Sequence, residues 1–505
     1  MQNVTKQTEA FRHYMKRMKG FEEAAGLLYW DMRTGAPRKG IEARSEVVGM
    51  LSAEVFKMSV APEMGEFIGY FQQPEIAAEL DEVTKRSIAE CAKDYERSKR
   101  VPAELYEEYV ALTSQAETIW EEAKTKADFA MFAPYLERII DFNKQFIELW
   151  GAGAHKYDTL LDMYEPGITV AQLDPLFAGL RERIVPLLRE IQQSPHQPDV
   201  SLISQSFPKE QQKQFCLYML QQIGYDFDAG RLDESSHPFA TGLNLGDVRI
   251  TTRYAEDDMS GALFGTIHEF GHALYDQNIS SELAGTVLCN GASMGIHESQ
   301  SRFWENIVAR SKPFWRKYFA PLQRHFPQQF GRVQQEDYYR AVNHVQPSLI
   351  RTESDELTYN LHVMVRYELE KAIFSNQMKT ADLPVAWNDK YKEYLGVVPP
   401  HDGVGVLQDV HWAAGLFGYF PSYALGNMYA AQLTNVIRRD IANFEALIEA
   451  GEFAPIRQCL HRHIHQHGKM LTPAELLMRV SGQTLRADEL VDYLTTKYKE
   501  IYKIS

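Results

Sequence analysis

Two histidines and a glutamate stand in the pattern HExxH at residues 268–272. Residues four apart share one face of a helix, so the rings of His268 and His272 would both reach one cation. Glu269 would project toward the open side of that cation, where it can take a proton from a metal-activated water. The pattern predicts a metal-dependent peptide hydrolase. The competing interpretation is a buried helix with two hydrogen-bonded histidines, so the surroundings must decide.

A third protein ligand is required, because a catalytic zinc site has three of them and one position for water. Glu298 begins another segment with helical periodicity, far enough beyond His272 for the chain to return on a second helix. We therefore expect Glu298 to be the third ligand. His297 competes for this role, but on a helix its side chain would point about 100° away from that of Glu298. A solvated glutamate that stabilises the start of a helix is the other alternative.

Helical periodicity dominates the chain and predicts a mainly α fold. Apolar side chains recur at helical spacing in three well-marked segments and again from about residue 355 to the end; the three segments are residues 105–123, 132–149 and 176–188. Such stripes are typical of buried helix faces rather than of cofactor sites.

Two segments depart from the helical pattern and predict a small β-sheet beside the HExxH helix. Residues 247–254 alternate apolar and polar side chains, and residues 285–289 are expected to form a second extended segment. No linker or repeat is visible, so we expect residues 1–505 to form a single catalytic domain. Within it, residues 1–130 could form a helical lobe over the cleft.

Length, charge and cysteine usage limit the function further. The chain has 505 residues, a formal net charge of -15 and 45% hydrophobic residues, as expected for a globular enzyme. The negative charge argues against nucleic-acid binding, because phosphate contacts need a basic surface. No apolar run is long enough to cross a membrane and no leader is apparent, so we expect a cytoplasmic protein without membrane association. Its four scattered cysteines are expected to be reduced.

A series of short motifs connects the HExxH segment with the rest of the chain. In order, they lie at residues 237–239, 247–251, 268–272, 297–300, 350–356 and 405–412. This series resembles the carboxypeptidase Taq family of metallocarboxypeptidases, and residues 29–37 look like that family's N-terminal signature. The resemblance spans residues ~25–430. Ser354 departs from the family pattern, which usually has alanine there, but a hydroxyl in place of a hydrogen changes little.

The resemblance implies a neurolysin-like helical body with a deep active-site groove, one divalent metal ion per subunit and a homodimer. It also implies removal of C-terminal amino acids from peptides. It carries metal binding onto His268, His272 and Glu298 and the general-base role onto Glu269, the same four residues that the spacing indicated. Zn²⁺ is the expected ion, with Co²⁺ or Mn²⁺ as alternatives, because sites of this composition accept several divalent metals.

The tetrahedral oxyanion of peptide hydrolysis needs hydrogen-bond donors besides the metal. Related helical zinc peptidases place a histidine and a downstream tyrosine on a glycine-rich segment, and residues 411–426 are such a segment. We expect His411 and Tyr423 to be the donors. Tyr419, otherwise expected to contact the substrate, is the rival of Tyr423, and packing in the core is the alternative for both tyrosines.

Cleavage at a C-terminus alone requires a fixed cation near the scissile bond, and the planar fork of arginine suits a carboxylate. Arg351 is the first candidate because it lies in one of the family motifs, and Arg249 on the expected strand is the second. Alternatively, Arg351 forms a structural ion pair with nearby acids such as Glu353 or Asp355. His237, which precedes a proline, is expected either to bind the substrate backbone or to cap a loop.

Four histidines at every second position, His461, His463, His465 and His467, cannot share one helix face. We expect a surface or loop cluster, with adventitious metal binding as the alternative.

Three functions remain to be compared. The first is a metallocarboxypeptidase that releases single amino acids from peptides. The second is a metallo-oligopeptidase that cuts internal bonds of short peptides, with the same metal chemistry but without the arginine. The third is a non-catalytic, helical peptide-binding scaffold whose HExxH pattern is structural.

Overall fold

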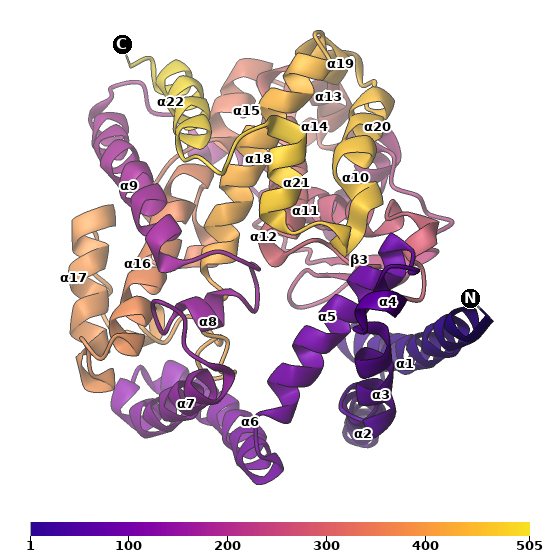
Figure 1. The fold of residues 1–505 in the computed structure, drawn as a ribbon. Helices are drawn as coiled ribbons and strands as arrows, with labels where there is room; N and C mark the ends of the chain where they lie inside the picture. Colours follow the sequence, from indigo (N-terminus) through magenta and orange to yellow (C-terminus); the bar gives the residue numbers. More distant parts are fainter. Residues whose placement is uncertain (1, 505) are drawn as a thin grey trace.

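The computed structural model describes residues 2–504, which fold mainly into helices (Figure 1). The N-terminal part contains α1 (Gln2–Thr34), α2 (Ile41–Ser59), α3 (Pro62–Phe71), α4 (Pro74–Ala77) and α5 (Glu82–Lys99). It is followed by α6 (Ala103–Lys126), α7 (Phe129–Trp150), α8 (Asp158–Leu161), α9 (Val170–Gln193) and α10 (Lys209–Ile223). The mainly α fold and the helices predicted from apolar spacing, which are α6, α7 and α9, are confirmed.

The C-terminal half contains the remaining helices and surrounds the HExxH segment. They are α11 (Met259–Gln277), α12 (Met294–Arg302), α13 (Lys312–His325), α14 (Pro327–Phe330), α15 (Gln335–Val342), α16 (Glu356–Phe374), α17 (Leu383–Leu395), α18 (Pro421–Asp440), α19 (Phe444–Ala450), α20 (Ala454–His463), α21 (Pro473–Ser481) and α22 (Asp488–Tyr502). In Figure 1, α18 runs through the middle of the body and packs against α12. None of the helices in residues 2–504 combines the length and the apolar character that spanning a bilayer requires.

A three-stranded sheet lies beside α11. It consists of β1 (Leu232–Glu234), β2 (Ala240–Asn244) and β3 (Asp247–Thr252), in the order β1-β3-β2, with β1 parallel and β2 antiparallel to β3. Val248 and Ile250 of β3 are fully buried on the side that packs toward the core, which confirms the predicted strand. The predicted extended segment at residues 285–289 is wrong. Gly285 has a φ of +74°, and the Cys289 N–H bonds back to Thr286 O, so this stretch forms turns.

Buried apolar side chains of the described residues form one large cluster in the body, a smaller one in the N-terminal part and a third of only three residues. The smaller cluster joins α1, α3 and α5 through side chains such as Phe11, Phe67 and Ile88, and its members lie between Val4 and Ala92. From Leu112 onward, the buried side chains of α6 and α7 belong to the large cluster. The lobe of residues 1–130 and the single catalytic domain stay predictions. All four cysteines are free thiols.

Candidate metal centre and substrate cavity

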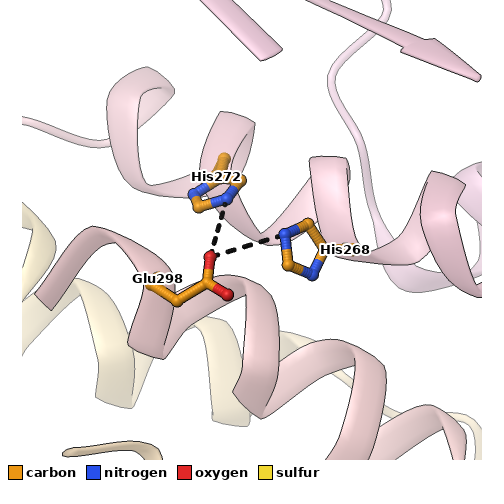
Figure 2. A group of neighbouring side chains, drawn as sticks. All are labelled: His268, His272 and Glu298. Carbon is orange, nitrogen blue, oxygen red and sulfur yellow. Dashed lines mark ion pairs between the residues drawn. The ribbon is translucent and has the colours of Figure 1, made fainter. Parts of the chain in front are cut away.

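His268, His272 and Glu298 converge from two helices that face each other. The α11 helix begins at Asp258, whose side chain accepts the N–H of Gly261, and α12 begins at Ser293, whose hydroxyl accepts the N–H of Ile296. Such caps fix where a helix starts and therefore which side chains share a face. Both histidines point toward the Glu298 carboxylate, as Figure 2 shows.

The separation of the three donor atoms fits a single metal ion. Glu298 Oε2 lies 3.5 Å from His268 Nε2 and 3.4 Å from His272 Nε2, and all three donor atoms lie within 4.8 Å of one another. Bonds of about 2 Å to a shared tetrahedral ion place neighbouring donors roughly 3.3 Å apart. The Glu298 carboxylate therefore already lies at the spacing from both imidazoles that a shared ion requires.

Two glycines allow the helices to approach closely enough for this geometry. A Cβ atom on Gly271 of α11 would lie 2.5 Å from the backbone of Gln300 and Ser301 on α12. A Cβ atom on Gly426 of α18 would lie 2.4 Å from Cγ of Glu298. Because real side chains cannot approach so closely, the glycines set the spacing of α11, α12 and α18 around Glu298.

The second nitrogen of each imidazole is held by a polar partner. Nδ1 of His268 lies 2.9 Å from Oε2 of Glu305, which belongs to a π-helical segment that continues α12 (Phe303–Ala309). Nδ1 of His272 lies 2.6 Å from Nδ1 of His297, whose Nε2 lies 3.0 Å from Oδ1 of Asp276. Partners of this kind fix the ring orientation and leave Nε2 to face a metal.

Sequence reasoning did not identify Glu305 and Asp276. Glu305 follows Glu298 by two helical turns and so lies near the same face, a signal that was available. Nothing in the sequence connects Asp276 with His297. His297, the rival ligand, instead contacts the side of His272 that faces away from Glu298.

The charges around the three donors favour a cation among them. Burial favours the neutral form of Glu298, but Arg302 and His268 outweigh it and hold its pKa well below the usual range. Nε of Arg302 lies 2.7 Å from the other carboxylate oxygen, Oε1. Burial also opposes a charge on His268, yet Glu298 raises the pKa of this histidine above its ordinary value, whereas burial lowers that of His272 to about 4. The ionised Glu298 carboxylate thus stabilises a positive charge next to it, and a divalent metal ion would supply that charge.

A cavity of about 860 Å³ opens onto the three donors and onto Glu269. Glu269 is 7% exposed, and burial raises its pKa to about 7. A carboxylate whose pKa lies near neutrality can both accept and return a proton at physiological pH. Its position in the cavity wall is therefore suited to acid–base chemistry beside the donors.

Both candidate tyrosines line the same cavity. The rings of Tyr419 and Tyr423 lie 5.3 Å apart, and Nε2 of His411 is 3.3 Å from the Tyr423 hydroxyl. Burial lowers the pKa of His411 to about 4, so the ring is neutral at physiological pH. The buried carboxylate of Glu370 fixes the segment between His411 and Tyr423, because it accepts hydrogen bonds from Trp412 Nε1 and from Gly418 N.

Arg351 lies in the cavity wall, but it also has an ion-pair partner. Its Nε and Nη2 lie 3.1 and 2.9 Å from Oδ1 of Asp409, and Nη1 donates to the Tyr359 hydroxyl at 3.0 Å. The partner is Asp409 and not Glu353 or Asp355, which the sequence had suggested. Oδ2 of Asp409 accepts from Arg366. Two arginines therefore share one carboxylate, and the group carries a net positive charge at the cavity.

Arg249 and His237 do not belong to the described residues that line this cavity. Arg249 pairs with Asp247 at 2.7 Å and lies over the ring of Trp30 at 4.4 Å. The side chain of His237 is exposed, and its carbonyl oxygen accepts a hydrogen bond from Ser235. Their proposed roles in substrate binding stay predictions.

The prediction of a surface cluster of histidines is wrong for one of its members. His465 is 1% exposed, and its Nε2 lies 2.9 Å from Oε1 of Gln300 on α12. The α20 helix ends before Ile464, and the change of backbone direction there turns the His465 ring toward the interior. His461 remains exposed at the surface.

Comparison with known proteins gives full-length similarities. The model of the carboxypeptidase Taq (M32) metallopeptidase family matches residues 10–498. The chain is 52% identical to Carboxypeptidase 1 of Bacillus subtilis over 97% of this chain and 98% of that protein. It is 42% identical to Thermostable carboxypeptidase 1 of Thermus thermophilus, over 94% of this chain and 95% of that protein. The crystal structure of an M32 carboxypeptidase from Deinococcus radiodurans superposes with a TM-score of 0.96 at 35% identity, covering 99% and 100% of the two chains.

Proposed function

This chain belongs to the carboxypeptidase Taq (M32) family and is a metallocarboxypeptidase, and on that premise we propose that it releases single C-terminal amino acids at the cavity described above. The convergence of His268, His272 and Glu298 on one point, with Glu269 beside them, carries this proposal. The substrates are peptides, as expected for a carboxypeptidase.

We propose Zn²⁺ as the ion, one per subunit, held by the two histidines and Glu298; Co²⁺ or Mn²⁺ would also suit these donors. When bound, the ion supplies Lewis acidity toward the scissile carbonyl and lowers the pKa of water at the site. Glu305 and His297 keep the two imidazoles turned toward the ion.

Glu269 is proposed to act as the general base. Its carboxylate takes a proton from the attacking water and then gives it to the departing amine. The buried position of Glu269 supports this role, because burial raises the pKa of the group to about 7 and makes it a more effective proton donor in the second step.

Tyr423 is proposed to donate a hydrogen bond to the oxyanion, with neutral His411 behind its hydroxyl. Tyr419 lines the same wall and stays the alternative donor, or a contact for the substrate.

The terminal carboxylate of the substrate is proposed to bind at Arg351. Asp409 neutralises only one of the two arginines that it contacts, so the group attracts an anion even though the whole chain is acidic. This feature favours a carboxypeptidase over an oligopeptidase that cuts internal bonds, since an internal bond offers no carboxylate to bind.

We also propose a homodimer, on the family resemblance alone, and a cytoplasmic location, since four free thiols suit a reducing compartment. The formal net charge of -15 argues against a nucleic-acid partner. Residues 1–505 would act as one catalytic domain, with residues 1–130 as a helical lobe.

The test of the mechanism is Glu269→Gln, with Glu353→Gln as the matched control. Glu353 is an exposed glutamate of the same cavity wall. We expect Glu269→Gln to keep its metal, measured by elemental analysis, and to lose at least about 100-fold in kcat, the usual contribution of a general base. Glu353→Gln should retain activity. Full activity of metal-loaded Glu269→Gln would show that another group takes the proton.

A further inference from the structure

A second group of metal-type donors lies outside the cavity, at the junction of α18 and α20. Asp440 is the last residue of α18, and Cys459 and His463 lie on α20. One sulfur, one imidazole nitrogen and one carboxylate oxygen from these residues all lie within 4.8 Å of one another. The helices α18 and α20 are in contact, and α19 connects them in the chain (Figure 1).

The spacing of the residues explains why the donors converge. Cys459 and His463 are four residues apart on one helix, so their side chains share a face. Nε2 of His463 lies 2.7 Å from Oδ2 of Asp440, whereas the other oxygen, Oδ1, is bound by Arg439 at 3.1 Å. Donors around a zinc-like ion are roughly 3.3–3.8 Å apart, given bonds of about 2.0–2.3 Å. A shift of under about 1 Å in the Asp440 carboxylate would therefore bring its Oδ2 to this distance from Nε2 of His463.

Burial distinguishes a metal site from a nucleophilic cysteine. Cys459 is 0% exposed, which excludes contact of its sulfur with a peptide carbonyl. The side chains of His463 and Asp440 are 22% and 25% exposed, so a small ion can enter from their side. A thiolate, an imidazole and a carboxylate together suit a borderline-soft cation of the zinc type, with a water as fourth ligand.

We propose that Asp440, Cys459 and His463 form a second divalent-metal site, which links the end of α18 to α20. The α18 helix and the chain that follows α20 both contact α12. The α18 helix carries Gly426 against Glu298, and the chain beyond α20 places His465 against Gln300 of α12. The second ion would thus be structural, and it would hold α20 against α18, the helix that packs on α12.

Cobalt gives a direct test, because thiolate ligation produces a near-ultraviolet charge-transfer band that histidine and carboxylate ligands do not produce. The donors proposed for the catalytic site include no sulfur, so this band does not arise from that site. The full-length protein is freed of metal and titrated with Co²⁺, while absorbance and bound metal are measured together. We expect two equivalents of cobalt and the thiolate band.

Single variants assign the band. Cys459→Ser should lose the band and one equivalent of cobalt, while Cys289→Ser, a change at a partly exposed cysteine, should keep both. Peptide hydrolysis should continue in both variants, so the outcome is separate from that of the proposed catalytic mechanism. His463→Asn changes a side chain that is 22% exposed and should also lose one equivalent. The proposal is overturned if the wild type binds one equivalent without the band, or if the band survives in Cys459→Ser.

Discussion

Replacement of Arg351 by glutamine tests the basis of exopeptidase specificity. Asp409 and Tyr359 accept hydrogen bonds from three of the five N–H groups of Arg351. Within residues 2–504 these are its side-chain hydrogen bonds, so two N–H groups remain for a substrate. The pair of Arg351 and Arg366 exceeds the charge of Asp409 by one positive charge, and Arg351→Gln removes that excess. Asp409 stays paired with Arg366 at 2.6 Å, so no buried carboxylate is left without a partner.

The size of the effect follows from the two free N–H groups. A hydrogen bond to a charged group contributes about 1.5–3 kcal/mol. Two of them give about 3 kcal/mol at the lower limit, or roughly a 100-fold loss in kcat/KM for peptides with a free C-terminus. Most of the loss should appear as a higher KM, because the carboxylate is bound in the ground state as well as in the transition state.

The assay compares one peptide sequence with a free and with an amidated C-terminus. Wild type should strongly prefer the free acid, and Arg351→Gln should reduce that preference by about 100-fold while hydrolysis of the amide stays nearly constant. Arg249→Gln is the matched control, since Arg249 is the rival arginine and lies outside the cavity lining. An unchanged preference in Arg351→Gln, or a loss in Arg249→Gln instead, would refute the assignment.

Three further changes test other parts of the site. Tyr423→Phe should lower kcat by about 100-fold, as expected for an oxyanion donor, and Tyr419→Phe should have a smaller effect; steady-state kinetics showing the reverse order would exchange the two roles. Gly271→Ala should lower the free energy of unfolding by about 1–3 kcal/mol and weaken metal binding, because the added methyl meets the α12 backbone at 2.5 Å. Gly265→Ala on the same helix, where the nearest atom is 3.9 Å away, should leave metal binding unchanged and raise the free energy of unfolding in urea titrations by about 0.5–1 kcal/mol. Burial lowers the pKa of His465 to about 3 in the folded protein. In the unfolded chain this histidine is protonated below about pH 6.5, whereas in the folded protein it stays neutral down to about pH 3. The free energy of unfolding should therefore fall as the pH drops from about 6.5 toward 3, by at most about 5 kcal/mol from this group, and His465→Asn should flatten that slope; an identical slope in the variant would contradict the argument.

Local patterns of the sequence predicted the helices, strand β3 and the two histidines of HExxH, because each depends on the period of a single element. Glu298 was also predicted from spacing, and the structure brings it within 3.5 Å of both imidazoles. The partner of Arg351 was not found, since Asp409 is distant in the sequence and meets Arg351 only in the folded chain. Residues 285–289 were misjudged because an apolar run can form turns when a glycine with positive φ precedes it.

The contacts at Gly271 and Gly426 bear on how the protein exchanges its ion. At Gly271 the backbone of α11 contacts the backbone of α12, and at Gly426 the backbone of α18 contacts Cβ and Cγ of Glu298. At these two points no long, flexible side chain lies between the helices to accommodate relative motion. Removal of the ion by a chelator should leave the arrangement of α11, α12 and α18 in place, and reloading should be limited by diffusion and dehydration of the incoming metal rather than by refolding.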